Sequence, residues 1–259
     1  SHSAWLHAPY VNGGLGLRYL EVDEMVGHLR ESILQGMPAS FHAIGDAAVS
    51  DVVNAFHAVA LEFGEERVRL GSHQIEHALL ASDSDLAELA RLNVAISAQP
   101  AFESTWGGSG CMYAERFGER WRGVSPLGRF LEHGGQLVLG SDAPVTAIDP
   151  WAAIKAATWH TLPEQRINRR SAFNAHTRSA YRRQGRFEAG VIEVGAPANL
   201  ALWKVSELVA SMEHETGGRW LADVRSGAPA LPDLSDTTPV CLLTLREGAV
   251  IYDALGCDE

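Results

Sequence analysis

Three short β-prone runs of the sequence each end in a side chain that can bind a metal ion. His42 lies in SFHA, His77 ends QIEH, and Asp142 follows LVLGS. In a parallel barrel the carboxyl ends of the strands meet at one face, where the active site is assembled from separate βα loops. Imidazole nitrogen and carboxylate oxygen are ligands that zinc takes in hydrolytic sites. The pattern therefore makes these three residues candidate ligands of one divalent ion.

Each of these residues also has a simpler interpretation. A single histidine at the end of a strand is more often a hydrogen-bonded core residue than a metal ligand. Asp142 is followed by Ala-Pro, a sequence that is equally typical of a turn. The residue pattern alone leaves both interpretations open.

Other residues near the predicted strand ends are candidates for supporting roles. Asp46 either orients His42 from behind or caps the helix that follows it. Gln99 either bonds the substrate or stabilises a turn. In the Gly- and aromatic-rich segment 101–124, Trp106 and Tyr113 either line an apolar pocket or anchor a loop. We therefore expect substrate contacts at Gln99 and Trp106, with Asp46 as the support of a metal ligand.

The elements that must position these residues follow an alternating pattern. Short β-prone runs alternate with longer amphipathic segments, which is typical of βα units on a parallel sheet. The predicted strands are 39–43, 74–77, 93–99 and 136–141. The predicted helices are 21–36, 47–63, a capped helix from Ser82, 125–134, 149–160 and 169–184. The chain is thus expected to divide into a partial (β/α) barrel at 1–184 and a β-rich appendage at 185–259, with strands at 199–203, 240–245 and 249–252.

Composition excludes several classes of protein and partner. The chain has 259 residues, of which 46% are hydrophobic and 20% charged, and its net charge is -11. An acidic chain without a dense basic face is a poor nucleic-acid binder, and no apolar run approaches the ~18 residues of a membrane span. Three cysteines without metal-ligand spacing indicate a reducing compartment, so we expect a cytoplasmic protein. The start, SHSAWLHAPY, has no secretory signal and is typical of the interior of a longer protein.

The number of strands is too small for a closed barrel. A (β/α)8 barrel takes ~250 residues for eight strands, whereas only four clear strands precede the appendage. A half-barrel leaves open sheet edges, which proteins normally pair or cover. We therefore expect association, either with a missing amino-terminal half or with a second copy of the chain as a homo-oligomer.

Several segments together resemble amidohydrolase family 3, the branch that includes N-substituted formamide deformylases. They occur in order along nearly the whole chain, and they are HAIGDAAV, IEHA, AQPAF, GSDAPVTAIDPWAAI and GAPANLALW. The resemblance implies an α/β fold, the carboxyl-terminal part of a (β/α)8 TIM barrel, with a small β-sandwich appendage. The four strands would be the fifth to eighth of that barrel.

The resemblance also implies roles for the strand-end residues. His42 and His77 would hold a divalent metal ion, zinc by preference. Asp142 would be a further ligand, and would serve as general base and then as acid toward the leaving nitrogen. The implied reaction is metal-assisted hydrolysis of a carbon–nitrogen bond in a small amide or formamide-like molecule.

The sequence departs from the family pattern at two places that bear on activity. The His-x-His pair of the first strand and the bridging ligand of the fourth have no counterpart in the chain. A second hypothesis is therefore a catalytically inactive fragment that acts as a binding or assembly module.

Overall fold

A four-stranded parallel sheet forms the centre of the molecule. The computed structural model describes residues 3–209 and 230–256. The strands are β1 (Ser40–Ala43), β2 (Gln74–His77), β3 (Ala95–Ala98) and β4 (Leu137–Leu139), and neighbours in the sheet follow the chain order β1-β2-β3-β4. All four predicted strands are present and parallel, which confirms the α/β fold with a partial barrel.

The strands have one face buried against helices and one face that is more open. Phe41, Ile75 and Ile96 are buried, whereas Ser40 and His42 on alternate positions of β1 are exposed. This alternation is what strand geometry requires when only one face of a sheet is covered. Polar residues on the open face therefore become candidates for the functional site.

Helices alternate with the strands. Their bounds are α1 (Val22–Gln35), α2 (Asp46–Phe63), α3 (Glu65–Leu70), α4 (Asp83–Arg91), α5 (Pro100–Trp106), α6 (Met112–Phe117), η1 (Gly118–Gly123), α7 (Leu127–Glu132), α8 (Pro150–Thr158), η2 (Pro163–Gln165), α9 (Arg169–His176) and α10 (Arg178–Arg183). Several of them, including α1, α2, α4 and α7, pack on the buried face of the sheet. The predicted helix at 169–184 is divided at Thr177, and the segment 101–124 is largely helical. In the described ranges no helix has the length and apolar character needed to cross a bilayer.

Capping side chains fix the starts of two helices that pack beside the sheet, α4 and α8. The Ser82 hydroxyl accepts a hydrogen bond from the Asp85 backbone N–H, at 3.1 Å, at the start of α4. Asp149 caps α8 in the same way through the N–H of Ala152, at 2.9 Å. Such caps typically contribute ~1 kcal/mol each, which explains why these helix starts could be predicted closely.

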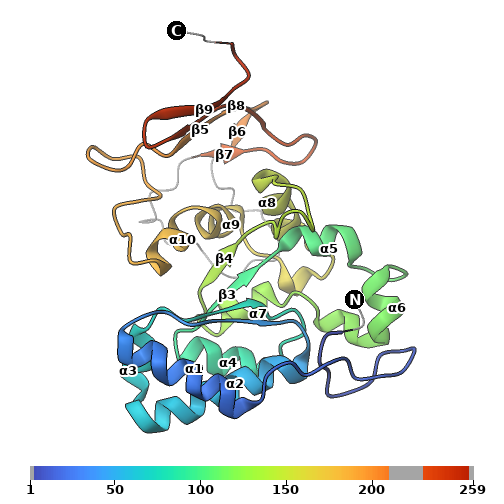
Figure 1. The fold of residues 1–259 in the computed structure, drawn as a ribbon. Coiled ribbons are helices and arrows are strands. Elements are labelled where there is room, and N and C mark those ends of the chain that lie inside the picture. Colours follow the sequence, from blue (N-terminus) through green and yellow to red (C-terminus); the bar gives the residue numbers. More distant parts are fainter. Residues whose placement is uncertain (1–2, 210–229, 257–259) are drawn as a thin grey trace.

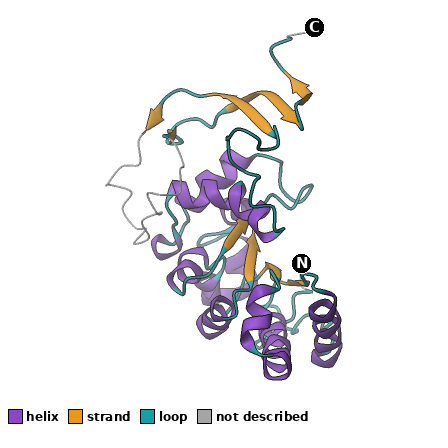
Figure 2. Ribbon diagram, turned by 90° about the vertical axis from the view of Figure 1, so that its left-hand side faces the viewer, coloured by secondary structure: helices purple, strands orange, loops and turns teal. Residues whose placement is uncertain are grey.

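The β-rich appendage lies at the opposite end of the molecule from α1–α4 (Figure 1). Its larger sheet has the antiparallel order β5-β8-β9, from β5 (Leu200–Lys204), β8 (Val240–Arg246) and β9 (Ala249–Asp253). A short ladder pairs β6 (Leu208–Val209) with β7 (Leu231–Pro232). The turned view shows these strands beyond the helices of the partial barrel (Figure 2). The predicted strands of the appendage are confirmed, whereas the domain division at residue 184 stays a prediction.

Arg183 of α10 closes the amino-terminal end of the sheet. Its guanidinium donates to the backbone carbonyl of His73, just before β2, and to that of Asn93 before β3, at 3.2 Å. His73 is itself fully buried, and its Nδ1 accepts the Ala39 N–H at 2.9 Å. Burial, with smaller contributions from the Arg183 and His28 charges, lowers the pKa of His73 to about 4.

The buried His73 predicts a loss of stability on acidification. Because its pKa falls from 6.5 to about 4 on folding, the unfolded chain takes up the proton first. The contribution is complete above about pH 6.5 and is lost as the pH falls toward 4. At about 1.4 kcal/mol per pKa unit, it is on the order of 3 kcal/mol. Burial also lowers the pKa of His160 and of His176 to about 4, so urea titrations from pH 7.5 to 4.5 measure the His73 contribution as the difference in slope between wild type and a variant without His73.

Asn in place of His73 keeps an acceptor near Ala39 and removes the titrating group. His73→Asn is expected to lower stability at pH 7.5 but to flatten its dependence on pH. His133→Asn, at an exposed histidine on the surface, is the matched control and should keep the wild-type slope. Equal slopes for wild type and His73→Asn would contradict the prediction.

Candidate functional site

The structure brings His42 and His77 into contact at the carboxyl ends of β1 and β2. Their ring centroids are 4.6 Å apart, and the rings meet edge to face at 81°. Strand pairing, in which Ala43 lies opposite His77, brings the two residues to the same end of the sheet. His42 is exposed and His77 is 7% exposed, so the pair has one open side. Two of the three predicted metal ligands therefore lie together.

Backbone conformation turns His77 out of the regular strand. Alternation would place it on the helix-covered face with Ile75, but His77 and the following Ala78 have φ of 75° and 47°. Asp142, after β4, also has a left-handed φ of 52°. This conformation is uncommon for residues other than glycine, and such strain is concentrated at functional sites. Of the seven non-glycine residues with positive φ in the described ranges, two are predicted metal ligands.

Asp142 lies at the same end of the sheet but does not complete a ligand sphere. Its side chain is exposed, and its negative charge acts to raise the pKa of the His77 imidazole. Across residues 3–209 and 230–256 no group of three His, Cys, Asp or Glu side chains is arranged to hold an ion. The ligand set of His42, His77 and Asp142 thus stays a prediction, of which the structure supplies the histidine pair.

Burial governs the protonation of His77. Desolvation lowers its pKa, and the positive charge of a protonated His42 lowers it further. The bond to Gln99 and the carboxylates of Glu76 and Asp142 act in the opposite direction. The net lowering favours the neutral imidazole, which is the form that binds a metal ion. The donor chemistry of the pair therefore fits a zinc-like ion.

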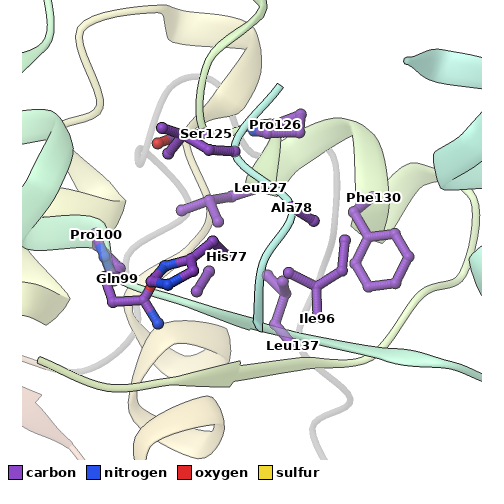
Figure 3. Close-up of a pocket in the computed structure, with 12 residues that line it drawn as sticks. His77, Ala78, Ile96, Gln99, Pro100, Ser125, Pro126, Leu127, Phe130 and Leu137 are labelled. Carbon is purple, nitrogen blue, oxygen red and sulfur yellow. The ribbon is translucent and has the colours of Figure 1, made fainter. Parts of the chain in front are cut away.

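Gln99 is held behind His77 and is 5% exposed. Its Oε1 is 2.7 Å from Nδ1 of His77, and its Nε2 donates to a carboxylate oxygen of Glu76 and to the Ser97 carbonyl, at 3.2 Å. Figure 3 shows the Gln99 amide beside the His77 ring. The predicted contact of Gln99 with substrate stays a prediction, because its amide is already engaged by three protein groups.

Glu76 is the residue that sequence reasoning missed. It occupies the open face of β2, opposite His42 on one side and Ser97 on the other. The Ser97 hydroxyl donates to it at 2.9 Å, in addition to the bond from Gln99. The signal was available in the strand period, since positions 40, 42, 74, 76 and 97 share the open face.

Asp46 begins α2, and its carboxylate reaches the amino-terminal segment. It accepts the backbone N–H of His7 at 3.0 Å and that of Ala47 at 2.9 Å. These bonds make Asp46 a tether between the chain start and the helix; the N-cap of α2 is Gly45, so the capping interpretation of Asp46 was wrong. Its predicted support of His42 stays a prediction.

A series of aromatic side chains in mutual contact extends from the His77 ring. Phe102 of α5 stacks on the His77 ring, with centroids 5.9 Å apart and planes at 19°. Trp106 packs on Phe102 at 4.8 Å and contacts Tyr113 at 6.3 Å. Tyr113 is 3% exposed, and burial raises its pKa, which fits the role of a loop anchor. Trp106 is half-buried one ring away from His77, and its contact with substrate stays a prediction.

Two spaces adjoin the histidine pair, and they differ greatly in size. A cavity of about 10 Å³ under His77 is lined by Ile96, Leu127 and Phe130, and has room for no more than a water molecule (Figure 3). A groove of about 320 Å³ runs along β1 past His42 and Tyr19. Only the groove is large enough to admit a small organic molecule.

Comparisons with known proteins agree with this architecture. The chain is 27% identical over 180 residues to the N-substituted formamide deformylase of Arthrobacter pascens. The aligned segment covers 64% of this chain and 31% of that protein. An uncharacterised metal-dependent hydrolase from Pyrococcus furiosus superposes with a TM-score of 0.64 at 29% identity, over 76% of this chain and 40% of that one.

A third comparison supports the fold alone. Atrazine chlorohydrolase TrzN from Arthrobacter aurescens TC1, complexed with zinc, superposes with a TM-score of 0.53 at 16% identity, over 92% of this chain and 49% of that one. The chain therefore spans about a third of the length of the deformylase and less than half of each of these solved structures.

The family comparison covers nearly the whole sequence. The model of the amidohydrolase family matches residues 1–252, which include the partial barrel with its histidine pair and almost all of the appendage. The chain belongs to the amidohydrolase family.

Proposed function

We propose that this chain forms the carboxyl-terminal part of a metal-dependent hydrolase that cleaves a carbon–nitrogen bond in a small amide or formamide-like molecule. The observation that carries the proposal is the contact of His42 with His77 at the carboxyl ends of adjacent parallel strands. Family membership and the metal-dependent Pyrococcus relative support it. The name of the Arthrobacter deformylase supports the class of bond.

His42 and His77 would hold the ion, for which zinc is the choice that fits imidazole donors. A bound divalent ion would supply Lewis acidity toward the carbonyl oxygen and would lower the pKa of the attacking water. Asp142 takes the proton of the attacking water and returns it to the leaving nitrogen. The exposed side of His42 and the groove along β1 give the substrate its route to these groups.

The second candidate function is an assembly module without activity of its own. It is favoured by the incomplete ligand set in the described residues and by β1, whose outer edge pairs with no strand in that part of the chain. Association with an amino-terminal half or with a second copy would cover this edge.

A reducing, cytoplasmic location accords with Cys111 and Cys241, which are free thiols.

Zinc binding tests the role of the histidine pair. We expect the dialysed chain to bind zinc, and His42→Ala or His77→Ala to weaken binding at least ~100-fold, because each ligand contributes several kcal/mol. Isothermal titration calorimetry measures the affinity, and His133→Ala at an exposed surface histidine is the control. Affinities that are equal across wild type and all variants would refute the assignment.

Replacement of the proposed proton carrier tests the reaction. Asp142→Asn is expected to lower kcat by ~10²- to 10⁴-fold, since the amide cannot carry the proton. The assay is hydrolysis of N-formyl amines by zinc-loaded protein, with release of formate as the readout. Asp83→Asn on the surface of α4 is the control and should retain full activity. A zinc-loaded chain without turnover would favour the assembly module.

The open edge of β1 predicts association in solution. Leu17 and Tyr19 beside the groove are 56% and 76% exposed, which leaves apolar surface next to an unpaired strand edge. We expect sedimentation velocity to show a dimer or larger species at micromolar concentration. A single compact monomer across this range would contradict the prediction.

A further inference from the structure

We propose that Glu76 is a positioning residue: acting through Gln99, it fixes His77 as the Nδ1–H tautomer and leaves Nε2 free to bind the metal ion. The role of Nε2 as a metal ligand rests on the proposed function. The tautomer of His77 is a property of the metal-free chain. Glu76 and His77 come from β2, and Gln99 comes from the turn after the adjacent strand β3.

The orientation of the Gln99 amide is determined by its neighbours. The Nε2 end faces two acceptors, the Glu76 carboxylate and the Ser97 carbonyl at 3.2 Å. An ionised carboxylate and a backbone carbonyl cannot donate, so the amide oxygen cannot occupy that position favourably. Oε1 of Gln99 is therefore directed toward His77, and the assignment of oxygen and nitrogen follows from the hydrogen bonds.

The amide oxygen in turn decides which nitrogen of His77 carries the proton. Oε1 of Gln99 can only accept, and Nδ1 of His77 lies 2.7 Å from it. Nδ1 must therefore donate, and a neutral imidazole with its proton on Nδ1 has its free lone pair on Nε2. A hydrogen bond to the second ring nitrogen is the usual way in which proteins prepare a histidine ligand.

Packing holds Glu76, Gln99 and His77, here called the relay, in place. The His77 ring stacks on Phe102 and is 7% exposed, which limits its rotation. Glu76 is fixed by the Ser97 hydroxyl at 2.9 Å and by the β2–β3 pairing that sets Glu76 opposite Ser97. Each member has its position set before any ion arrives, so the ligand is preorganised.

Histidine tautomers can be read directly by NMR in the metal-free chain. We expect long-range ¹H–¹⁵N spectra at pH 8 to show His77 as the Nδ1–H tautomer in the wild type, with the signal assigned by its loss in His77→Gln. In Glu76→Gln the new amide can donate as well as accept, so Gln99 is free to turn over. His77 should then populate both tautomers, and zinc affinity should fall about 10- to 100-fold.

A matched control and a second variant make the test specific. Glu88→Gln alters another glutamate that bonds a histidine, His57 at 2.7 Å on the surface. It should leave both the His77 tautomer and zinc affinity unchanged. Gln99→Met removes the acceptor at similar volume, and should move the His77 proton to Nε2 with a comparable loss of zinc affinity. Far-ultraviolet circular dichroism confirms that each variant is folded.

The outcomes separate this inference from the proposed function. An Nε2–H tautomer in the wild type, or a Glu76→Gln spectrum identical to that of Glu88→Gln, would overturn the relay. A tautomer that responds as expected in a chain that binds no zinc would uphold the relay while refuting the metal site.

Discussion

The parallel pairing of β1 with β2 is the constraint on which the site depends. It sets Ala43 opposite His77 and His42 opposite Glu76, so that two imidazoles and a carboxylate from separate parts of the sequence become neighbours. A slip of one residue would move these side chains to the other face of the sheet. The buried residues Phe41 and Ile75 oppose such a slip, because it would expose them to water. The core thus stabilises the geometry of the site as well as the fold.

The local strain at His77 is offset by the contacts that the turned ring makes. A left-handed residue other than glycine costs about 1 kcal/mol or more. In return, the ring gains a hydrogen bond from Nδ1 to Gln99, a stack on Phe102 and contact with His42. A regular strand end would keep His77 among the helices and away from His42. The strain is therefore tied to the arrangement that makes the histidine pair.

Strands and capped helices could be predicted because their signals are local. The runs around Phe41 and Ile75 are β-prone and continuous, and Ser82 and Asp149 mark helix starts with their own side chains. The bounds of helix α5 were not predicted, although Pro100 at its first turn is a local start signal; its packing on His77 through Phe102 is a tertiary contact that the segment does not display. The strand period places Glu76 on the open face, but its role depends on bonds to Ser97 and Gln99, which its own segment of sequence does not display.

The chemistry of the histidine pair explains why the free edge of β1 matters for function. Catalytic zinc sites use three protein ligands and keep one position open, whereas the described residues bring together two. Asp142 can serve as a third ligand only if its exposed side chain moves closer to His77. The Asp142 carboxylate already acts on His77 electrostatically, since its charge raises the His77 pKa. Other donors must otherwise come from a chain segment packed beside β1, where the groove reaches His42, or beside β4, the other edge strand of the described sheet. Covering the sheet edge and completing the ligand set would then be one event, so that metal affinity would rise with assembly.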